Sequence, residues 1–365
     1  MKKTIPYIAV AAVTIMMLAS PMRSLEYARY SLNLCFDVII PSLFPFFVCS
    51  GLLIYSGFAK GLSKICRPVM KPLFNISGCG AAAFVLGVIS GYPLGAVTAC
   101  QLYESGYLSK TETERLLAFC NNSGPLFILG AVGSAIYASP KIGVILYTAH
   151  ILAALSVGVI FRFYAPGHHN APDYSINQNE QSFSETFSQV LASSVSSILT
   201  VCGAIIFFGA VSGIVSSMLP SDSIAGTVVT AILEMTNGVN NISRLDIPLL
   251  NKLILSAFTV GFAGLCVHLQ VMSTAAKQHL SLLPYLFGKL LHGAAAALYT
   301  FILLRLFPDA LSVFNAAGSG GGYFAASLYT VISAMFCAIL AVLVIIFSFM
   351  TGRRRLNENT KKSDT

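Results

Sequence analysis

The chain has 365 residues, of which 56% are hydrophobic and only 10% are charged. Because an ordinary soluble domain carries about 25% charged residues, this composition excludes a water-soluble globule and indicates a polytopic, all-α membrane protein. The net charge of +8 does not indicate nucleic-acid binding, because much of it lies in short clusters beside apolar segments, where the positive-inside rule places Lys and Arg.

The first apolar run, residues 5–19, follows two lysines and has the shape of a secretory signal peptide. Pro21 comes directly after the small-residue cleavage point at Ala19-Ser20 and disfavours processing. We therefore expect a retained first helix, although the run is short for a span of about 20 residues. Residues 24–37 predict an amphipathic helix at the interface, and residues 38–58 form the next apolar segment.

A basic stretch follows, with four cations and no acid: Lys60, Lys64, Arg67 and Lys71. Short loops with this bias face the cytoplasm, and the basic tail after residue 352 indicates the same side.

Two interrupted apolar segments come next, at residues 78–103 and 110–137. The first contains Ser90-Gly91-Tyr92-Pro93, and the second contains Asn121-Asn122-Ser123-Gly124-Pro125. Such interruptions free backbone N–H and C=O groups, which are tolerated at membrane depth only inside protein or beside a watery cavity. Paired broken segments of this kind indicate a transporter's substrate site. Between them, Ser109 and Glu112 fit a capping box.

A polar stretch at residues 165–184 divides the chain into two halves, residues 1–164 and 185–351, before a polar basic tail at 352–365. The second half repeats the order of the first: an amphipathic stretch, an apolar segment, two interrupted segments and further apolar runs at residues 286–307 and 323–350. We expect breaks near Tyr92-Pro93, Ser123-Gly124, Asn237-Gly238 and Ala263-Gly264. The order predicts two pseudo-symmetric, inverted halves with about eight to ten membrane segments.

The motifs SGYPLGA, LYESGYLSKTETERLLAFCNNSGPLFILGAVG, EMTNG and GFAGLCVHLQ resemble those of the YlbJ-type sporulation integral membrane proteins of endospore-forming bacteria. Those proteins carry the nucleoside-recognition, or Gate, domain and are related to concentrative nucleoside transporters. The resemblance implies a multi-pass protein that moves dipicolinic acid, a small anionic solute, across the outer forespore membrane. Nothing in composition or spacing shows that substrate.

Glu234 is the acid that we single out, because no basic residue lies within nine positions of it. An ionisable side chain inside a membrane segment costs about 2.5–3.5 kcal/mol and usually faces a cavity or a partner. Glu234 is therefore the candidate ion-coupling residue. The alternative is a carboxylate at a helix end that reaches the interface.

Polar residues at or near the breaks are the candidates for substrate binding. Pro125 fits the first turn of a new helix, whose free N–H groups favour an anion. Helix capping and interhelical hydrogen bonds are the alternative roles. The candidates are Ser90, Gly91, Gln101, Asn121, Asn122, Ser123, Asn237, Gly238, His268 and Gln270.

Motifs for catalysis are missing: the sequence has no G-x-S-x-G, H-E-x-x-H or Walker A pattern. We expect no enzyme activity and no cofactor. His168-His169 and the nine single cysteines could bind metal, but a solvated loop and small buried hydrophobes account for them better. Two function classes stay open, a solute transporter and a non-transporting membrane assembly component, and so does association with itself or with other sporulation proteins.

Overall fold

The computed structural model describes residues 4–56, 58–165, 182–218 and 224–307. Every regular element in these ranges is a helix, so the expected all-α fold is confirmed there. The expected apolar run at 323–350, the basic tail and His168-His169 lie outside the described residues.

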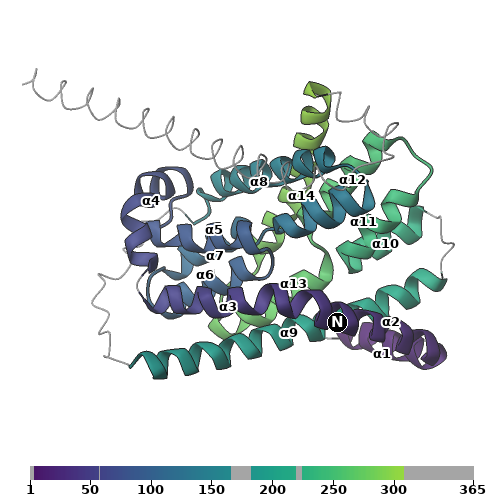
Figure 1. Ribbon diagram of the computed structural model, residues 1–365, viewed down its shortest axis with the longest axis horizontal. Helices are drawn as coiled ribbons and strands as arrows, with labels where there is room; N and C mark the ends of the chain where they lie inside the picture. The colour runs from purple at the N-terminus through teal and green to yellow at the C-terminus, as the bar shows by residue number, and fades with distance from the viewer. Residues whose placement is uncertain (1–3, 57, 166–181, 219–223, 308–365) are drawn as a thin grey trace, which may run out of the picture.

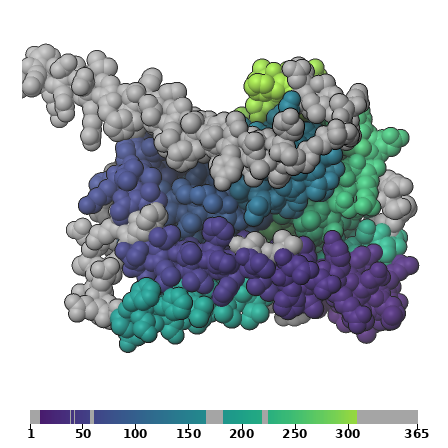
Figure 2. All heavy atoms as spheres, in the orientation of Figure 1, coloured from purple at the N-terminus to yellow at the C-terminus, as the bar shows by residue number. Residues whose placement is uncertain are grey.

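Long helices at the start of each half form one layer of the molecule. After α1 (Thr4–Ala19), the chain runs without interruption through α2 (Pro21–Leu34), the π-helical turn η1 (Cys35–Ile39) and α3 (Ile40–Tyr55). This rod packs against the 36-residue α9 (Phe183–Met218), and Figure 1 shows the two side by side. In Figure 2 they cover the lower edge of the molecule, in purple and teal.

The first interrupted segment folds back on itself. After α4 (Phe58–Phe74) and the short η2 (Gly78–Gly80), α5 (Ala81–Ser90) leads to a turn at residues 91–93, and α6 (Leu94–Glu104) returns. Gly87 of α5 faces Gly95 of α6, so the two helices are antiparallel, and we call α5–α6 the first hairpin. The chain turns because Gly91 has φ +92°, a conformation that favours glycine.

The second interrupted segment continues across the molecule. The short helix α7 (Lys110–Cys120) begins at Ser109, whose capping box with Glu112 is confirmed. An extended stretch at residues 121–124 follows, and the chain goes on through the π-helix η3 (Leu126–Ile136) before α8 (Pro140–Phe161) returns.

The same order recurs after α9. Helices α10 (Ile224–Leu233) and α11 (Met235–Arg244) form a second hairpin, with Gly238 packed on Ala231. The broken segment α12 (Leu249–Phe262) and α13 (Gly264–Ala275) follows, then η4 (Ala276–Gln278) and α14 (Leu283–Leu306). In Figure 1 the two hairpins lie at opposite ends of the molecule.

Three of the four expected breaks are confirmed, at residues 91–93, 121–125 and 263. The fourth was wrong: Asn237 and Gly238 lie inside α11, and the break is at Glu234. The carboxylate of Glu234 caps α11, so that helix begins at Met235, two residues before Asn237. The glycine instead allows α11 to approach α10 closely.

Four helices of the described ranges are long and apolar enough to span a membrane: Pro140–Phe161, Phe183–Met218, Leu249–Gln278 and Leu283–Leu306. A fifth span results if the pair Gly61–Phe74 and Gly78–Ser90, bent by 97°, is one span. The expectation of eight to ten segments was made for the whole chain and included the run at 323–350, which lies outside the described residues, but the described ranges still contain fewer spans than we expected there. One reason is that the hairpins turn back after 10 or 11 residues on each side.

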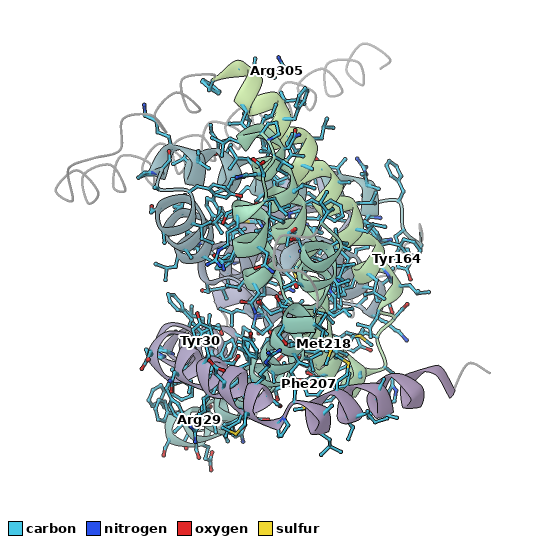
Figure 3. All side chains as sticks on the ribbon, turned by 90° about the vertical axis from the view of Figure 1, so that its right-hand side faces the viewer. Arg29, Tyr30, Tyr164, Phe207, Met218 and Arg305 are labelled. Carbon is cyan, nitrogen blue, oxygen red and sulfur yellow. The ribbon has the colours of Figure 1, made fainter. Side chains whose placement is uncertain are left out.

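Charged side chains of α7 fasten several loops at one end of the molecule. The Arg115 guanidinium donates to the backbone carbonyls of Asn75, Tyr164 and Ala165 at 2.7–2.8 Å. Glu114 accepts from the Ser281 N–H at 2.8 Å and from the Tyr164 hydroxyl at 3.1 Å. Burial and the Glu114 carboxylate raise the pKa of Tyr164. Figure 3 labels Tyr164 and, at the far end of α14, Arg305.

The close approach of helices at Gly95 gives a test of the fold. A Cβ at this position would collide with the Cys120 carbonyl oxygen, a backbone atom that cannot rotate away. We expect Gly95→Ala to lower the free energy of unfolding by about 1–3 kcal/mol, measured by thermal unfolding in detergent. The control is Gly203→Ala on α9, where nothing lies within 4 Å and the change should be neutral or stabilising. Equal stability of the two variants would contradict the packing.

Candidate functional site

The two breaks of the first half cross each other. A Cβ on Gly91 would lie 2.8 Å from the Gly124 N atom, and a Cβ on Gly124 would lie 3.0 Å from the Ser90 carbonyl oxygen. Gly87 and Gly95 both face the Cys120 carbonyl. The turn of the first hairpin therefore lies against the extended stretch between α7 and η3, and the contact is between backbone atoms of the two segments.

The two breaks of the second half meet in the same way. Ala263 has the left-handed φ of +77°, and Gly264 follows at +73°. A Cβ on Gly264 would lie 3.3 Å from the Ile232 carbonyl oxygen and 3.3 Å from the Met235 N atom. The break of α12–α13 therefore lies against the turn of the second hairpin.

Glu234 forms that turn. Its carboxylate oxygens accept hydrogen bonds from the N–H groups of Thr236 and Asn237, both at 2.8 Å. Both oxygens are thus occupied at the N-terminus of α11, where a negative charge is favoured. This geometry shows a capping role, and ion coupling by Glu234 stays a prediction.

Tyr92 joins the two halves. Its hydroxyl lies 2.8 Å from the carbonyl oxygen of Val260, to which it donates, and 3.2 Å from the sulfur of Met235. Val260 belongs to α12 just before its break, and Met235 opens α11. The turn of the first hairpin therefore contacts both breaks of the second half.

A buried cation lies beside this contact. Lys289 of α14 is 0% exposed. Its ammonium donates to the Asn121 carbonyl oxygen at 3.0 Å and lies 3.5 Å from His292 Nδ1. It also lies 5.5 Å from the centre of the Tyr92 ring, where a cation is attracted to the aromatic face.

Two histidines extend this polar centre toward α8. The rings of His150 and His292 lie 4.3 Å apart, and both are buried. His150 Nε2 accepts from the Ser123 N–H at 3.0 Å, and His292 Nε2 lies 3.0 Å from the His150 carbonyl oxygen. The Ser123 bond requires a neutral His150 with its proton on Nδ1.

Many polar atoms of this centre have no hydrogen-bond partner in the part of the chain that the structure describes. They include both side-chain amide atoms of Asn121, Asn122 Oδ1, Ser123 Oγ, Ser90 Oγ, His150 Nδ1 and His268 Nε2. Buried polar atoms are usually paired, so this concentration makes the centre polar enough to hold water or a polar solute.

The centre is closed in this structure. A cavity beside His150 and Ser256 has a volume of about 10 Å³, which is about the space of one water molecule. A solute of any size can reach Lys289 only if the surrounding helices separate.

The remaining candidates lie on α6 and α13, which pack against each other. His268 Nδ1 lies 3.0 Å from the Tyr285 hydroxyl, and Gln270 Nε2 bonds to Cys266 Sγ of its own helix. Gln101 is half-buried, and its side-chain oxygen has no partner in the described ranges. The structure thus brings Gly91, Asn121 and Ser123 together with Lys289, but it joins neither Gln101 nor Gln270 to them by a hydrogen bond.

Sequence reasoning missed Lys289, His292 and His150. The signal was present, because each is a titratable residue within an apolar run. Lys289 is the fourth residue of the apolar run that begins at residue 286. At that position a lysine is expected to lie at the membrane surface, beside the end of the span. For metal, the described residues contain no group of three His, Cys, Asp or Glu that could hold an ion, and the described cysteines are free, most of them buried.

Two comparisons with known proteins found similar sequences. A family model described as nucleoside recognition (Gate) matches residues 36–218, which include the first hairpin and the break between α7 and η3. The sporulation integral membrane protein YlbJ of Bacillus subtilis (strain 168) is 28% identical over 327 residues, covering 80% of each chain. No solved structure matches.

The cap at Glu234 is open to a direct test. Glu234→Ala removes both acceptors and should lower the free energy of unfolding by about 0.5–2 kcal/mol. Glu234→Gln keeps one acceptor oxygen and should cost less. Thermal unfolding of both variants in the same detergent measures the difference. If Glu234→Ala were as stable as the unmodified protein, the capping role would be wrong.

Proposed function

Because the chain belongs to the Gate nucleoside-recognition family, we propose that it is a sporulation membrane protein that transports a small anionic solute. Its relative YlbJ is named a sporulation integral membrane protein. The proposed solute is dipicolinate and the proposed location is the outer forespore membrane, as the resemblance of the motifs implies.

One observation carries the proposal: four interrupted segments meet at a buried polar centre that contains a cation. Interrupted helices are retained inside a membrane where they form a binding site or line a cavity. The contact of Gly91 with Gly124, and of Gly264 with Met235, places all four breaks near Tyr92 and Lys289. A protein with a purely structural role has no need for so many unpartnered polar atoms there.

We also propose that the two halves are inverted repeats. Apart from α4 and η2, which have no counterpart among the described residues after α9, each half has long helices, a hairpin, a broken segment and a final helix, in that order. The hairpins lie at opposite ends of the molecule (Figure 1), as an inverted pair requires. Opening of one hairpin at a time would then expose the centre to one side of the membrane, as in alternating access.

Dipicolinate suits this centre better than a neutral solute does. It carries two carboxylates, and the centre offers the Lys289 ammonium and the amide of Asn121 at 0% exposure. With no Walker A motif in the sequence, we expect a substrate gradient, an ion gradient or a partner protein to supply the driving force.

Two alternatives follow from specific observations. The description of the family as nucleoside recognition favours a nucleoside-like solute. The closed packing around Lys289 favours a membrane component that assembles with other proteins and transports nothing.

Uptake by the purified full-length protein in proteoliposomes distinguishes the three functions. We expect labelled dipicolinate to enter protein-containing vesicles faster than protein-free vesicles, and uridine not to do so. Uptake of uridine alone would favour the nucleoside-like solute. Absence of uptake for both solutes would favour the assembly role.

A further inference from the structure

Lys289 is the starting point. A lysine ammonium has three N–H donors. Two of them have neighbours in the structure, the Asn121 carbonyl oxygen at 3.0 Å and His292 Nδ1 at 3.5 Å. Within the described ranges, the third donor has no acceptor and no carboxylate forms an ion pair with the ammonium.

Such an arrangement is costly. A charged side chain inside a membrane segment is costly, and a buried charge is normally paired. Helices α12, α8 and α7 pack against α14 and could supply a counter-charge. However, α12 contains no acid, α8 contributes the neutral ring of His150, and the residue that follows α7 contributes the Asn121 carbonyl. The described protein therefore provides a dipole and an aromatic face for this cation, but no anion.

The polar side chains around the ammonium are hydrogen-bonding groups that are only weakly paired within the described residues. Asn121 accepts from Lys289 through its backbone, and its own amide, at 0% exposure, interacts with the Tyr285 hydroxyl without a hydrogen bond of good geometry. Ser123, two residues on, is 1% exposed, and its hydroxyl interacts with the Tyr92 hydroxyl without a hydrogen bond of good geometry. An ammonium, an amide N–H and a hydroxyl together match a carboxylate, whose two oxygens accept several hydrogen bonds.

Aromatic rings border the same place. The Tyr92 ring lies 5.5 Å from the ammonium. Tyr285 is fully buried and shares a hydrogen bond with His268. A flat ring in the ligand could stack on such neighbours, whereas a neutral ribose would leave the ammonium without a counter-charge.

We propose that Lys289, with the Asn121 amide and the Ser123 hydroxyl, is a carboxylate-binding site for a small aromatic carboxylate. The proposal rests on the proposed function, because it takes the same centre as the solute site. It adds the residue that selects the ligand class, and it assigns Lys289 a direct contact with the ligand.

The experiment measures ligand binding by the purified full-length protein in detergent, by calorimetry and by the ligand-induced shift in unfolding temperature. The probes are dipicolinate, isophthalate (two carboxylates without the ring nitrogen), pyridine (no carboxylate) and uridine. The variants are Lys289→Met and Lys289→Gln. The matched control is Lys277→Met, which removes an exposed lysine of η4.

We expect the unmodified protein and Lys277→Met to bind both dicarboxylates and neither neutral probe. Both Lys289 variants should bind dicarboxylates about tenfold or more weakly, because a charge-assisted hydrogen bond is lost. The ligand-free variants should unfold at or above the normal temperature, because an apolar or neutral side chain replaces a buried charge.

Two results would overturn the proposal: dicarboxylate binding unchanged in both Lys289 variants, or no dicarboxylate binding by the unmodified protein. The transport assay distinguishes failure of the proposed binding site from failure of the proposed function. Uptake of dipicolinate with unchanged binding in the variants would retain the function and reject the site. Binding that depends on Lys289 without any uptake would retain the site and reject transport.

Discussion

Interrupted helices at the centre of a membrane protein leave backbone N–H and C=O groups without helical hydrogen bonds and away from water. The fold depends on how neighbouring segments shield these groups from lipid. Each of the four interruptions lies against another one. The turn at Gly91 contacts Gly124, and the break at Ala263-Gly264 contacts the turn at Glu234. Glycine is needed at these contacts because a Cβ on Gly91 or Gly124 would approach neighbouring backbone atoms to 3.0 Å or less.

This mutual covering also concentrates polar side chains. Because the breaks contact one another, a residue that caps a broken helix or follows its last turn also lies close to the other breaks. Asn121, Ser123, Tyr92 and Glu234 reach the centre in this way, and α14 adds Lys289. The result is a centre with many hydrogen-bonding groups that is shielded from solvent, with Lys289 at 0% exposure.

The sequence predicted the helical class and three of the four breaks. It did so because the backbone freedom of Gly and the fixed φ and missing N–H of Pro interrupt a helix whatever surrounds them. It failed at Glu234, where a single non-helical residue separates α10 from α11 and a carboxylate replaces the usual small cap. It could not show that α5–α6 and α10–α11 turn back, because a re-entrant hairpin and a kinked span have similar apolar patterns. Lys289 was missed because its burial depends on α7 and α8, which are distant in sequence.

We propose that the first hairpin enters and leaves on one side of the membrane, while α7–η3 crosses it. Single cysteines in a cysteine-free background test this with a membrane-impermeant maleimide applied to oriented vesicles. Positions 64 and 110 flank the first hairpin, whereas positions 141 and 246 follow η3 and α11, and all four are exposed. The account predicts that 64 and 110 react from one side, the cytoplasmic side by charge, and that 141 and 246 react from the other. Reaction of positions 64 and 110 from opposite sides would contradict it.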